Sequence, residues 1–155
     1  MVVLSFDIDG TLVDSTSRLI SCMENGKVDW KCFLDCGKLG MDKPIPLNIS
    51  IINKAIRSGL AVILVTGRPE RMRECTLSQL MKFGVDVGGI RMLVMRGDHD
   101  DRPDPEYKVD ALAGVGLPDV IHCDDNEDTV NSLISHGFKA TLASKCDSIN
   151  PYLNP

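Results

Sequence analysis

The sequence predicts an α/β fold with a doubly wound parallel sheet, and two observations carry that prediction. Five short runs of apolar and β-branched residues are mostly continuous rather than alternating, which is typical of strands buried on both faces of a parallel sheet. Segments with helical periodicity lie between these runs, and such alternation predicts helices on both faces of the sheet. The predicted strands are Val2–Phe6, Ala61–Val65, Met92–Met95, Val120–Cys123 and Ala140–Ala143.

Amphipathic helices are predicted from a spacing of about 3.6 residues between apolar side chains. The first lies in PIPLNISIINKAIRSG, where Pro46 opens the helix and Gly59 closes it. The second lies in RPERMRECTLSQLMKFG and stops at Gly84, and the last one stops at Gly137. The residues predicted to face the core are Leu47, Ile51, Ile52, Ala55 and Ile56 in the first helix, Met72, Cys75, Leu80 and Phe83 in the second, Tyr107, Val109 and Leu112 in a short third, and Val130, Leu133 and Ile134 in the last.

The stretch from Ser15 to Lys43 does not follow this alternation. It is irregular, carries Trp30, Phe33 and Leu34, and is interpreted as a helix plus a loop over the sheet edge. The chain has 155 residues, enough for one domain with a proper core but short for two. We therefore predict a single domain over residues 1–155.

Charge and cysteine content restrict the class of protein. A net charge of −5 gives no electrostatic footprint for broad binding to nucleic acid or a membrane, although a local basic groove stays open. The N-terminal apolar run ends at Asp7 and is too short for a signal peptide or a bilayer span, so a cytoplasmic location is predicted. The six cysteines are then expected to be reduced thiols, and Cys32 and Cys36 lack the further ligands of a zinc site. The other four are Cys22, Cys75, Cys123 and Cys146.

Polar clusters follow three of the predicted strands at the point where each strand ends. Asp7 and Asp9 follow the first strand, where Gly10 lets the chain turn sharply and Thr11 adds a hydroxyl. Because ligands of an open α/β sheet bind outside the C-terminal ends of its strands, we expect the three clusters to form one site. The other two clusters are Thr66, Gly67 and Arg68 after the second strand, and Asp124, Asp125 and Asp128 after the fourth.

Carboxylates crowded in this way repel one another, and a divalent cation usually holds them together. Mg²⁺ is the natural choice for a site built of oxygen ligands. Once the cation offsets the repulsion, one carboxylate can act as a nucleophile and another as an acid or base.

Four short motifs resemble those of the haloacid dehalogenase (HAD) superfamily, and they occur in the family's order over most of the chain. DIDGT resembles motif one, VTGR resembles motif two, Lys108 can serve as motif three, and DDNEDT resembles motif four. The resemblance implies a Rossmann-like core. The second aspartate of motif one implies a phosphatase or phosphotransferase rather than a dehalogenase.

The resemblance also implies a role for each motif residue. Asp7 attacks phosphorus and forms an aspartyl phosphate, while Asp9 protonates the leaving oxygen and then activates water. Thr66 and Lys108 bind the phosphoryl oxygens. The expected Mg²⁺ ligands are Asp7, the backbone carbonyl of Asp9 and Asp124, with Asp125 or Asp128 in support.

The spacing of the motifs leaves no room for a large cap domain, so an open site is expected that could admit the end of a polymer. Three runs, TGRPERMRECTLSQLMKFGV, LVMRGDHDDRPDPEYKVDAL and HCDDNEDTVNSLISHGFKA, resemble the phosphatase domain of phage-type polynucleotide kinase/3′-phosphatases. This sequence contains no GxxxxGK[ST] motif, so we expect the phosphatase module without a kinase half. Arg68, Arg71, Arg96 and Arg102 form either a basic rim for phosphates or a set of arginines paired with nearby aspartates.

Three functions follow in order of preference. The first is a Mg²⁺-dependent phosphomonoesterase that resembles polynucleotide 3′-phosphatases and acts on nucleic-acid ends or nucleotides. The second is a general phosphatase of nucleotides or sugar phosphates, and the third is a non-catalytic phosphate-binding module. The predicted substrate-binding residues are Gly10, Thr11, Gly67, Arg68, Arg96 and Arg102. Asp128 is alternatively a helix cap, and His99, His122 and His136 are interpreted as exposed or internally hydrogen-bonded.

Overall fold

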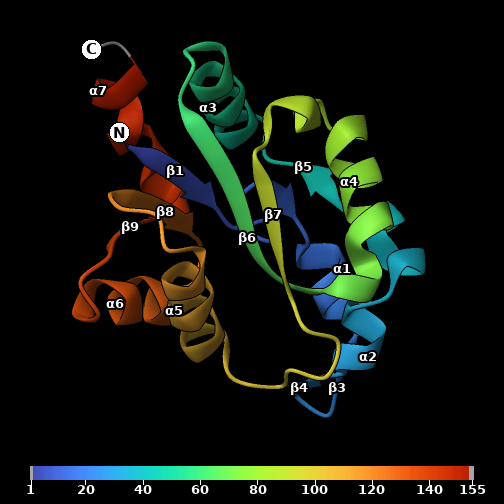
Figure 1. Cartoon of the computed structure of the whole chain (residues 1–155). Helices are drawn as coiled ribbons and strands as arrows, with labels where there is room; N and C mark the ends of the chain where they lie inside the picture. The colour runs from blue at the N-terminus through green and yellow to red at the C-terminus, as the bar shows by residue number, and fades with distance from the viewer. Residues whose placement is uncertain (1, 154–155) are drawn as a thin grey trace.

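A parallel five-stranded sheet forms the centre of the computed structural model, which describes residues 2–153 (Figure 1). All five predicted strands are confirmed, with ends that shift by up to four residues. The strands are β1 (Val3–Phe6), β6 (Ala61–Pro69), β7 (Met92–Arg96), β8 (Val120–Asp124) and β9 (Lys139–Leu142), in the spatial order β7-β6-β1-β8-β9.

The first strand lies in the middle of the sheet, and this position decides where a ligand can bind. Val3 of β1 pairs with Ala61 of β6 on one side and with Val120 of β8 on the other. The chain builds outward from β1 in one direction with β6 and β7, and then in the other with β8 and β9. A crevice is expected where the direction reverses, beyond the C-terminal ends of β1 and β8.

Helices cover both faces of the sheet, as the sequence predicts (Figure 1). Leu4 and Phe6 pack in the core on one face, and their neighbour Val3 packs on the other, which is the alternation of a strand. The first face carries α3 (Pro46–Arg57), α4 (Arg73–Lys82) and the C-terminal turns η4 (Ala143–Ile149) and α7 (Asn150–Leu153), and the second carries α5 (Asp104–Val115) and α6 (Glu127–Ser135).

Two residues predicted to be buried in the helices are exposed. Leu47 lies in the first turn of α3, where Asn48 takes the inward position and donates hydrogen bonds to the carbonyls of Thr11 and Ala143. Ile134 lies near the end of α6, where Leu133 faces the sheet instead. In both cases the residue one position away makes the tertiary contact, which a helical periodicity alone does not decide.

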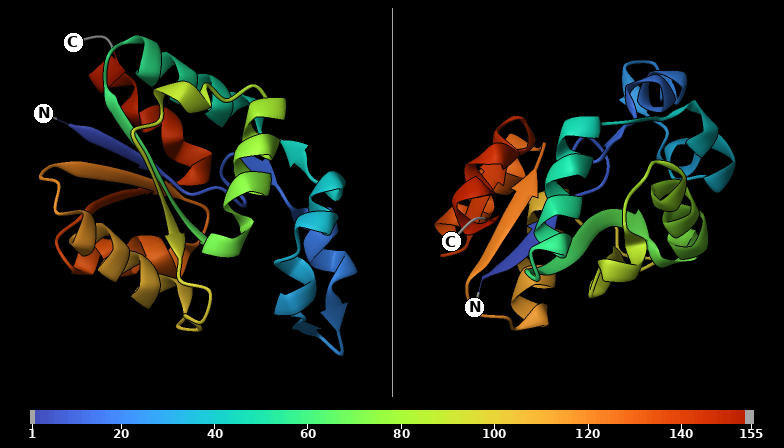
Figure 2. Two further views of the ribbon diagram at one scale, coloured as in Figure 1. Left: turned by 45° about the vertical axis from the view of Figure 1, so that its right-hand side comes forward. Right: turned by 90° about the horizontal axis from the view of Figure 1, so that it is seen from above.

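Residues 15–42 form a small lobe with a paired neck. The neck is an antiparallel pair of short strands, β2 (Val13–Asp14) and β5 (Lys43–Pro44). Figure 2 shows the lobe at one end of the molecule, beside α4. The expected helix plus loop is replaced by α1 (Thr16–Ser21), the hairpin β3–β4 (Met23–Glu24 and Lys27–Val28), α2 (Trp30–Phe33) and η1 (Cys36–Met41).

The expectation of reduced thiols is wrong for this structure, because all six cysteines are paired. Cys22–Cys32 closes the lobe on itself, and Cys36–Cys75 ties it to α4. Cys123–Cys146 joins β8 to η4. These partners are 10 to 39 residues apart, and only the fold brings them together.

Replacing Cys36 and Cys75 together with serine is expected to lower the free energy of unfolding by about 2–4 kcal/mol, because a disulfide restricts the unfolded chain. Urea unfolding of the oxidised protein measures this loss. Reductant should then shift the midpoint of the variant less than that of the wild type. Free thiols in the untreated wild type under denaturing conditions would contradict the pairing.

No helix within residues 2–153 combines the length and the apolar character that crossing a membrane requires.

Candidate active site

The predicted polar clusters meet beyond the C-terminal ends of β1, β6 and β8, at the edge where the sheet topology places a crevice. A pocket of about 760 Å³ opens there. Asp7, Asp9 and Lys108 line its polar side. Leu19 and Trp30 of the lobe line its apolar side.

Lys108 stands at the centre of the polar side and is almost completely buried. Its Nζ lies 2.9 Å from an oxygen of Asp7, 2.6 Å from Asp124 and 3.2 Å from Asp104. Burial by itself lowers the pKa of Lys108, but these carboxylates outweigh it and hold the pKa well above its ordinary value. Lys108 therefore carries a positive charge at the point where the carboxylates converge.

Three carboxylates are grouped closely enough to hold a metal ion. Asp7, Asp124 and Asp125 each offer an oxygen, and these oxygens lie within 4.8 Å of one another. Burial and the charge of Asp124 raise the pKa of Asp7 well above its ordinary value. Asp125 is more exposed, but partial burial and the charge of Asp124 raise its pKa as well. Three carboxylates outnumber the one lysine among them, and their oxygens are hard ligands, so the group fits Mg²⁺.

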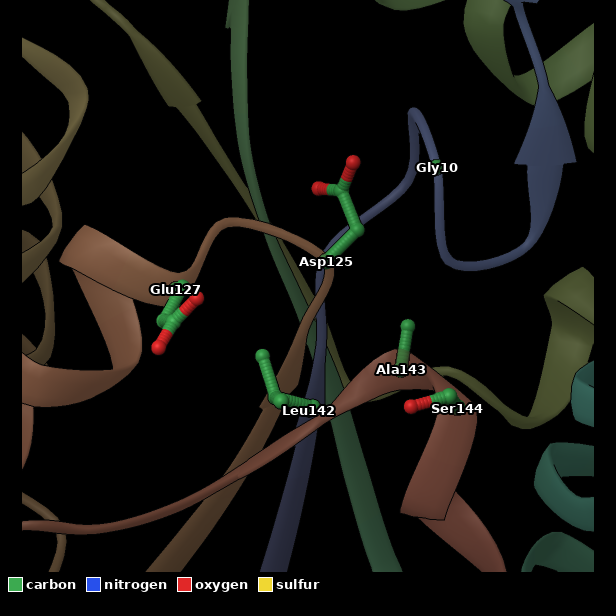
Figure 3. Close-up of a pocket in the computed structure, with 6 residues that line it drawn as sticks. All are labelled: Gly10, Asp125, Glu127, Leu142, Ala143 and Ser144. Carbon is green, nitrogen blue, oxygen red and sulfur yellow. The ribbon is translucent and has the colours of Figure 1, made fainter.

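The loop after β1 passes so close to Asp125 that it needs a glycine. Gly10 has a φ of +82°, and a Cβ there would lie 2.0 Å from the Asp125 carboxylate. Figure 3 shows that carboxylate rising beside the Gly10 loop, with Glu127 turned elsewhere. Because Gly10 has no Cβ, the Asp125 carboxylate has room to lie beside those of Asp7 and Asp124.

Asp125, rather than Asp128, joins Asp7 and Asp124 in this group. Asp128 is exposed at the rim of the pocket. It does not cap α6 either, because the side chain of Asn126 accepts the hydrogen bond from the Thr129 amide at 3.1 Å. Asn and Asp are equally good N-cap residues, and here the backbone places Asn126, not Asp128, at that position.

The side chain of Asp9 is not part of this three-carboxylate group and instead meets two buried arginines. Arg68 donates to it from Nε at 3.0 Å and from Nη2 at 2.9 Å. Arg18, from the lobe, donates from Nη2 at 2.5 Å. Burial raises the pKa of Asp9, but the charges and hydrogen bonds of the two arginines outweigh it and lower the pKa to about 2.

Asp42 at the end of the lobe balances the charge of this arginine pair. Its side chain and that of Arg18 have no solvent exposure, and the two are 3.0 Å apart. Arg68 lies 3.8 Å from Asp42, and Gln79 of α4 donates to it at 2.8 Å. Two buried cations thus face two carboxylates, Asp9 and Asp42.

Acid should destabilise the protein partly through Asp9. A pKa lowered from 3.8 to about 2 gives stability that is complete above about pH 4 and is lost as the pH falls towards 2. The expected loss is about 2 kcal/mol, since the Asp9 side chain is only 21% exposed. Thermal unfolding of wild type and Asp9→Asn between pH 5 and pH 2 measures it. An equally steep fall in both proteins would contradict the assignment.

Comparison with known proteins decides the family. The family model for "HAD superfamily, subfamily IIIB (Acid phosphatase)" matches residues 1–114. The chain belongs to the HAD superfamily. The matched subfamily is one of phosphatases, which supports phosphomonoesterase activity. No curated protein sequence matches it significantly.

Solved structures confirm the fold of this HAD phosphatase. A chain of the Pnkp1/Rnl/Hen1 complex is 22% identical with a TM-score of 0.71, and the match covers 90% of this chain but only 45% of that one. Protein Tyrosine Kinase A from Mycobacterium tuberculosis is 15% identical over 90% and 82% of the two chains, with a TM-score of 0.65. CbbY from Rhodobacter sphaeroides, in complex with phosphate, is 12% identical over 92% and 86%, with a TM-score of 0.62.

Three predicted ligand residues, Gly10, Thr11 and Thr66, lie outside the lining of the 760 Å³ pocket, and Gly10 lines a second pocket beside Asp125. Thr66 is buried, and its hydroxyl accepts a hydrogen bond from the amide of Arg68 at 3.0 Å. Thr11 is fully buried, and its hydroxyl has no hydrogen-bond partner within the described part of the chain. Gly67 does line the pocket, and a Cβ there would lie 2.9 Å from Asp104. The roles assigned to these residues stay predictions.

The four arginines do not form a free basic rim, because each contacts a carboxylate. Arg96 donates to the carbonyls of Gly67 and Arg102, at 3.1 and 2.6 Å, and lies 3.4 Å from Asp104. Arg102 donates to Asp100 at 2.8 Å and also contacts Asp110. Arg71 lies 3.9 Å from Asp98, and Arg68 is engaged with Asp9 as described above. Arg68, Arg96 and Arg102 also line the pocket, and their role in substrate binding stays a prediction.

Five residues at the site lie outside the motifs. Asp104 lies four residues before Lys108 in α5, a spacing that places both on one helix face and could have identified it. His122 is buried and takes the second of the two alternatives given for it, because its ring nitrogens lie 2.9 Å from Asp124 and 2.7 Å from Ser5. No local pattern identifies the lobe residues Arg18, Asp42 and Trp30.

Proposed function

We propose that this HAD phosphatase is a Mg²⁺-dependent phosphomonoesterase that forms a phosphoryl–Asp7 intermediate and prefers 3′-phosphorylated nucleotides or nucleic-acid ends. The observation that carries the proposal is the arrangement of Asp7, beside Lys108 and two further carboxylates, at the base of an open pocket. The proposal assigns the activity to residues 1–155 as one unit.

Asp7 would attack the phosphorus atom, and the bond between phosphorus and the ester oxygen would break. Asp9 would give its proton to the leaving oxygen, and later take a proton from the water that cleaves the phosphoryl–Asp7 bond. Bound Mg²⁺, held by Asp7, Asp124, Asp125 and the Asp9 carbonyl, would neutralise negative charge on the carboxylates and the phosphoryl group. Lys108 forms an ion pair with Asp7, so its positive charge would also lie next to the phosphoryl group.

The low pKa of Asp9 prepares it for the second of these steps, in which it must be ionised to act as a base. Donating a proton in the first step needs a higher pKa. A phosphoryl group placed in the pocket would change the pKa of Asp9 in that direction, because a nearby negative charge favours the protonated carboxyl.

Two features support a nucleotide or a nucleic-acid end as the substrate, and a third limits how much of it the protein contacts. The lobe is small and leaves the pocket open. The Pnkp1/Rnl/Hen1 protein of similar fold is part of an RNA repair complex. The net charge of −5 and the paired arginines favour contact with one or two nucleotides over a long backbone track.

The predicted cytoplasmic location stays a prediction, and the disulfides favour an oxidising environment instead.

Phosphate release across a panel of esters tests this function. The panel holds a 3′-phosphorylated oligonucleotide, 3′- and 5′-mononucleotides, a sugar phosphate, a phosphopeptide and an aryl phosphate. We expect the highest kcat/KM for the 3′-phosphates, and loss of activity on all esters after chelation, with recovery on adding Mg²⁺. Equal use of all small esters would favour the general phosphatase, and full activity in chelator would exclude the Mg²⁺ requirement.

A further inference from the structure

The lobe gives the pocket an apolar wall that faces the polar side carrying Asp7. The wall consists of Leu19, Trp30, Phe33 and Leu34. Trp30 is the only tryptophan of the chain and is 60% exposed, although it belongs to the same pocket as the catalytic carboxylates. The exposed ring of such a side chain is available for contact with a ligand in the pocket.

A continuous series of contacts sets the position of Trp30 relative to Asp9. Arg18 contacts Asp9 through Nη2, and its Nη1 donates to the Phe33 carbonyl at 2.6 Å. The guanidinium of Arg18 also lies over the Phe33 ring, 4.2 Å from its centre. The Phe33 ring meets the Trp30 ring edge to face at 5.9 Å. The buried Arg18 and Phe33 therefore hold the exposed indole at a fixed place.

The short helix that carries Trp30 is held at both ends. Four residues cannot form a stable helix alone. The Asp29 side chain caps it by accepting from the amides of Lys31 and Cys32 at 3.1 and 3.3 Å. Cys32 is joined to Cys22 at the end of α1 by a disulfide. An aromatic ring held in place before binding loses little conformational freedom when a ligand stacks on it.

We propose that the nucleobase of the substrate stacks on Trp30 as a platform while Asp7 accepts the phosphoryl group. Trp30 would then select substrates whose leaving group carries a flat ring. This inference rests on the proposed function and names the part of the site that selects the substrate class. Stacking on an exposed aromatic ring accepts every base, because every base has a π-face. The platform therefore predicts preference for nucleotides over ring-free esters without preference among bases.

Fluorescence of the single tryptophan tests the platform without any turnover. The Asp7→Asn variant is titrated with adenosine 3′-monophosphate, with glycerol phosphate and inorganic phosphate as ring-free controls. N-acetyltryptophanamide measures collisional quenching and light absorbed by the base. We expect saturable quenching by the nucleotide alone. Equal responses to the ring-free anions, or no saturable response to the nucleotide, would overturn the proposal.

Kinetics separate this inference from the proposed function. Trp30→Ala should lower kcat/KM for a 3′-mononucleotide by about 5- to 150-fold and leave that for glycerol phosphate within about twofold. Trp30→Phe should restore most of the loss, because it keeps a ring. Ile20→Ala is the matched control, since Ile20 is 67% exposed on the same lobe but does not line the pocket.

Each pattern of results has one meaning. Equal kcat/KM for Trp30→Ala and wild type on nucleotides would overturn the platform and leave the phosphatase standing. Equal losses on nucleotides and glycerol phosphate would also overturn it, because Trp30 would then act only through the structure of the lobe. Saturable quenching with no hydrolysis of any 3′-phosphate would support the platform and reject the proposed reaction.

Discussion

Asp7→Asn is expected to lower phosphate release at least about 1,000-fold for every ester, because an amide cannot replace the carboxylate as the nucleophile. The loss should fall on kcat, and no phosphoenzyme should form with any substrate. Single-turnover assays with excess enzyme measure both. Asp147→Asn, which removes an exposed carboxylate on η4, should keep full activity. Residual activity within tenfold of wild type would contradict the role of Asp7.

The same variant should not lose stability in the presence of chelator. Burial and the charge of Asp124 raise the pKa of Asp7, so its ionisation at neutral pH costs the folded state free energy. Asparagine removes that charge, while Lys108 keeps Asp124 and Asp104 as partners. The thermal midpoint at pH 7 should therefore be equal to that of the wild type or higher. A clear decrease would mean that the Lys108–Asp7 attraction outweighs the repulsion.

The second large effect is expected from Asp42→Asn, which lies outside every motif. Among residues 2–153, the substitution leaves Asp9 as the only carboxylate within hydrogen-bond distance of the buried Arg18 and Arg68. An uncompensated buried charge costs about 3–5 kcal/mol. The thermal midpoint of a protein of this size should then fall by about 10 °C. Activity should fall as well, because the two arginines that position Asp9 lose their second anchor.

Two controls distinguish the loss of the Asp42 charge from a general effect of substitution. Asp147→Asn again serves as the exposed match and should change the thermal midpoint very little. Asp42→Leu with Arg18→Met removes the buried pair as a whole and should recover part of the loss, since well-packed apolar residues can replace a buried ion pair. A midpoint for Asp42→Asn close to the wild type would show that water reaches the arginines.

Local sequence patterns determined the parallel sheet, the helices and the principal carboxylates of this HAD phosphatase. Buried strands are continuous apolar runs, and the motif residues follow them directly, so Asp7 and Asp124 could be placed at strand ends without coordinates. The tertiary structure alone decided that Asp9 faces Arg18 and Arg68, that Asp125 joins the metal-binding group, and that the cysteines pair. It also placed Trp30 in the pocket. The physical reason is that periodicity reports which face of an element is buried, whereas ion pairs, disulfides and pocket walls depend on which distant segments the fold brings into contact.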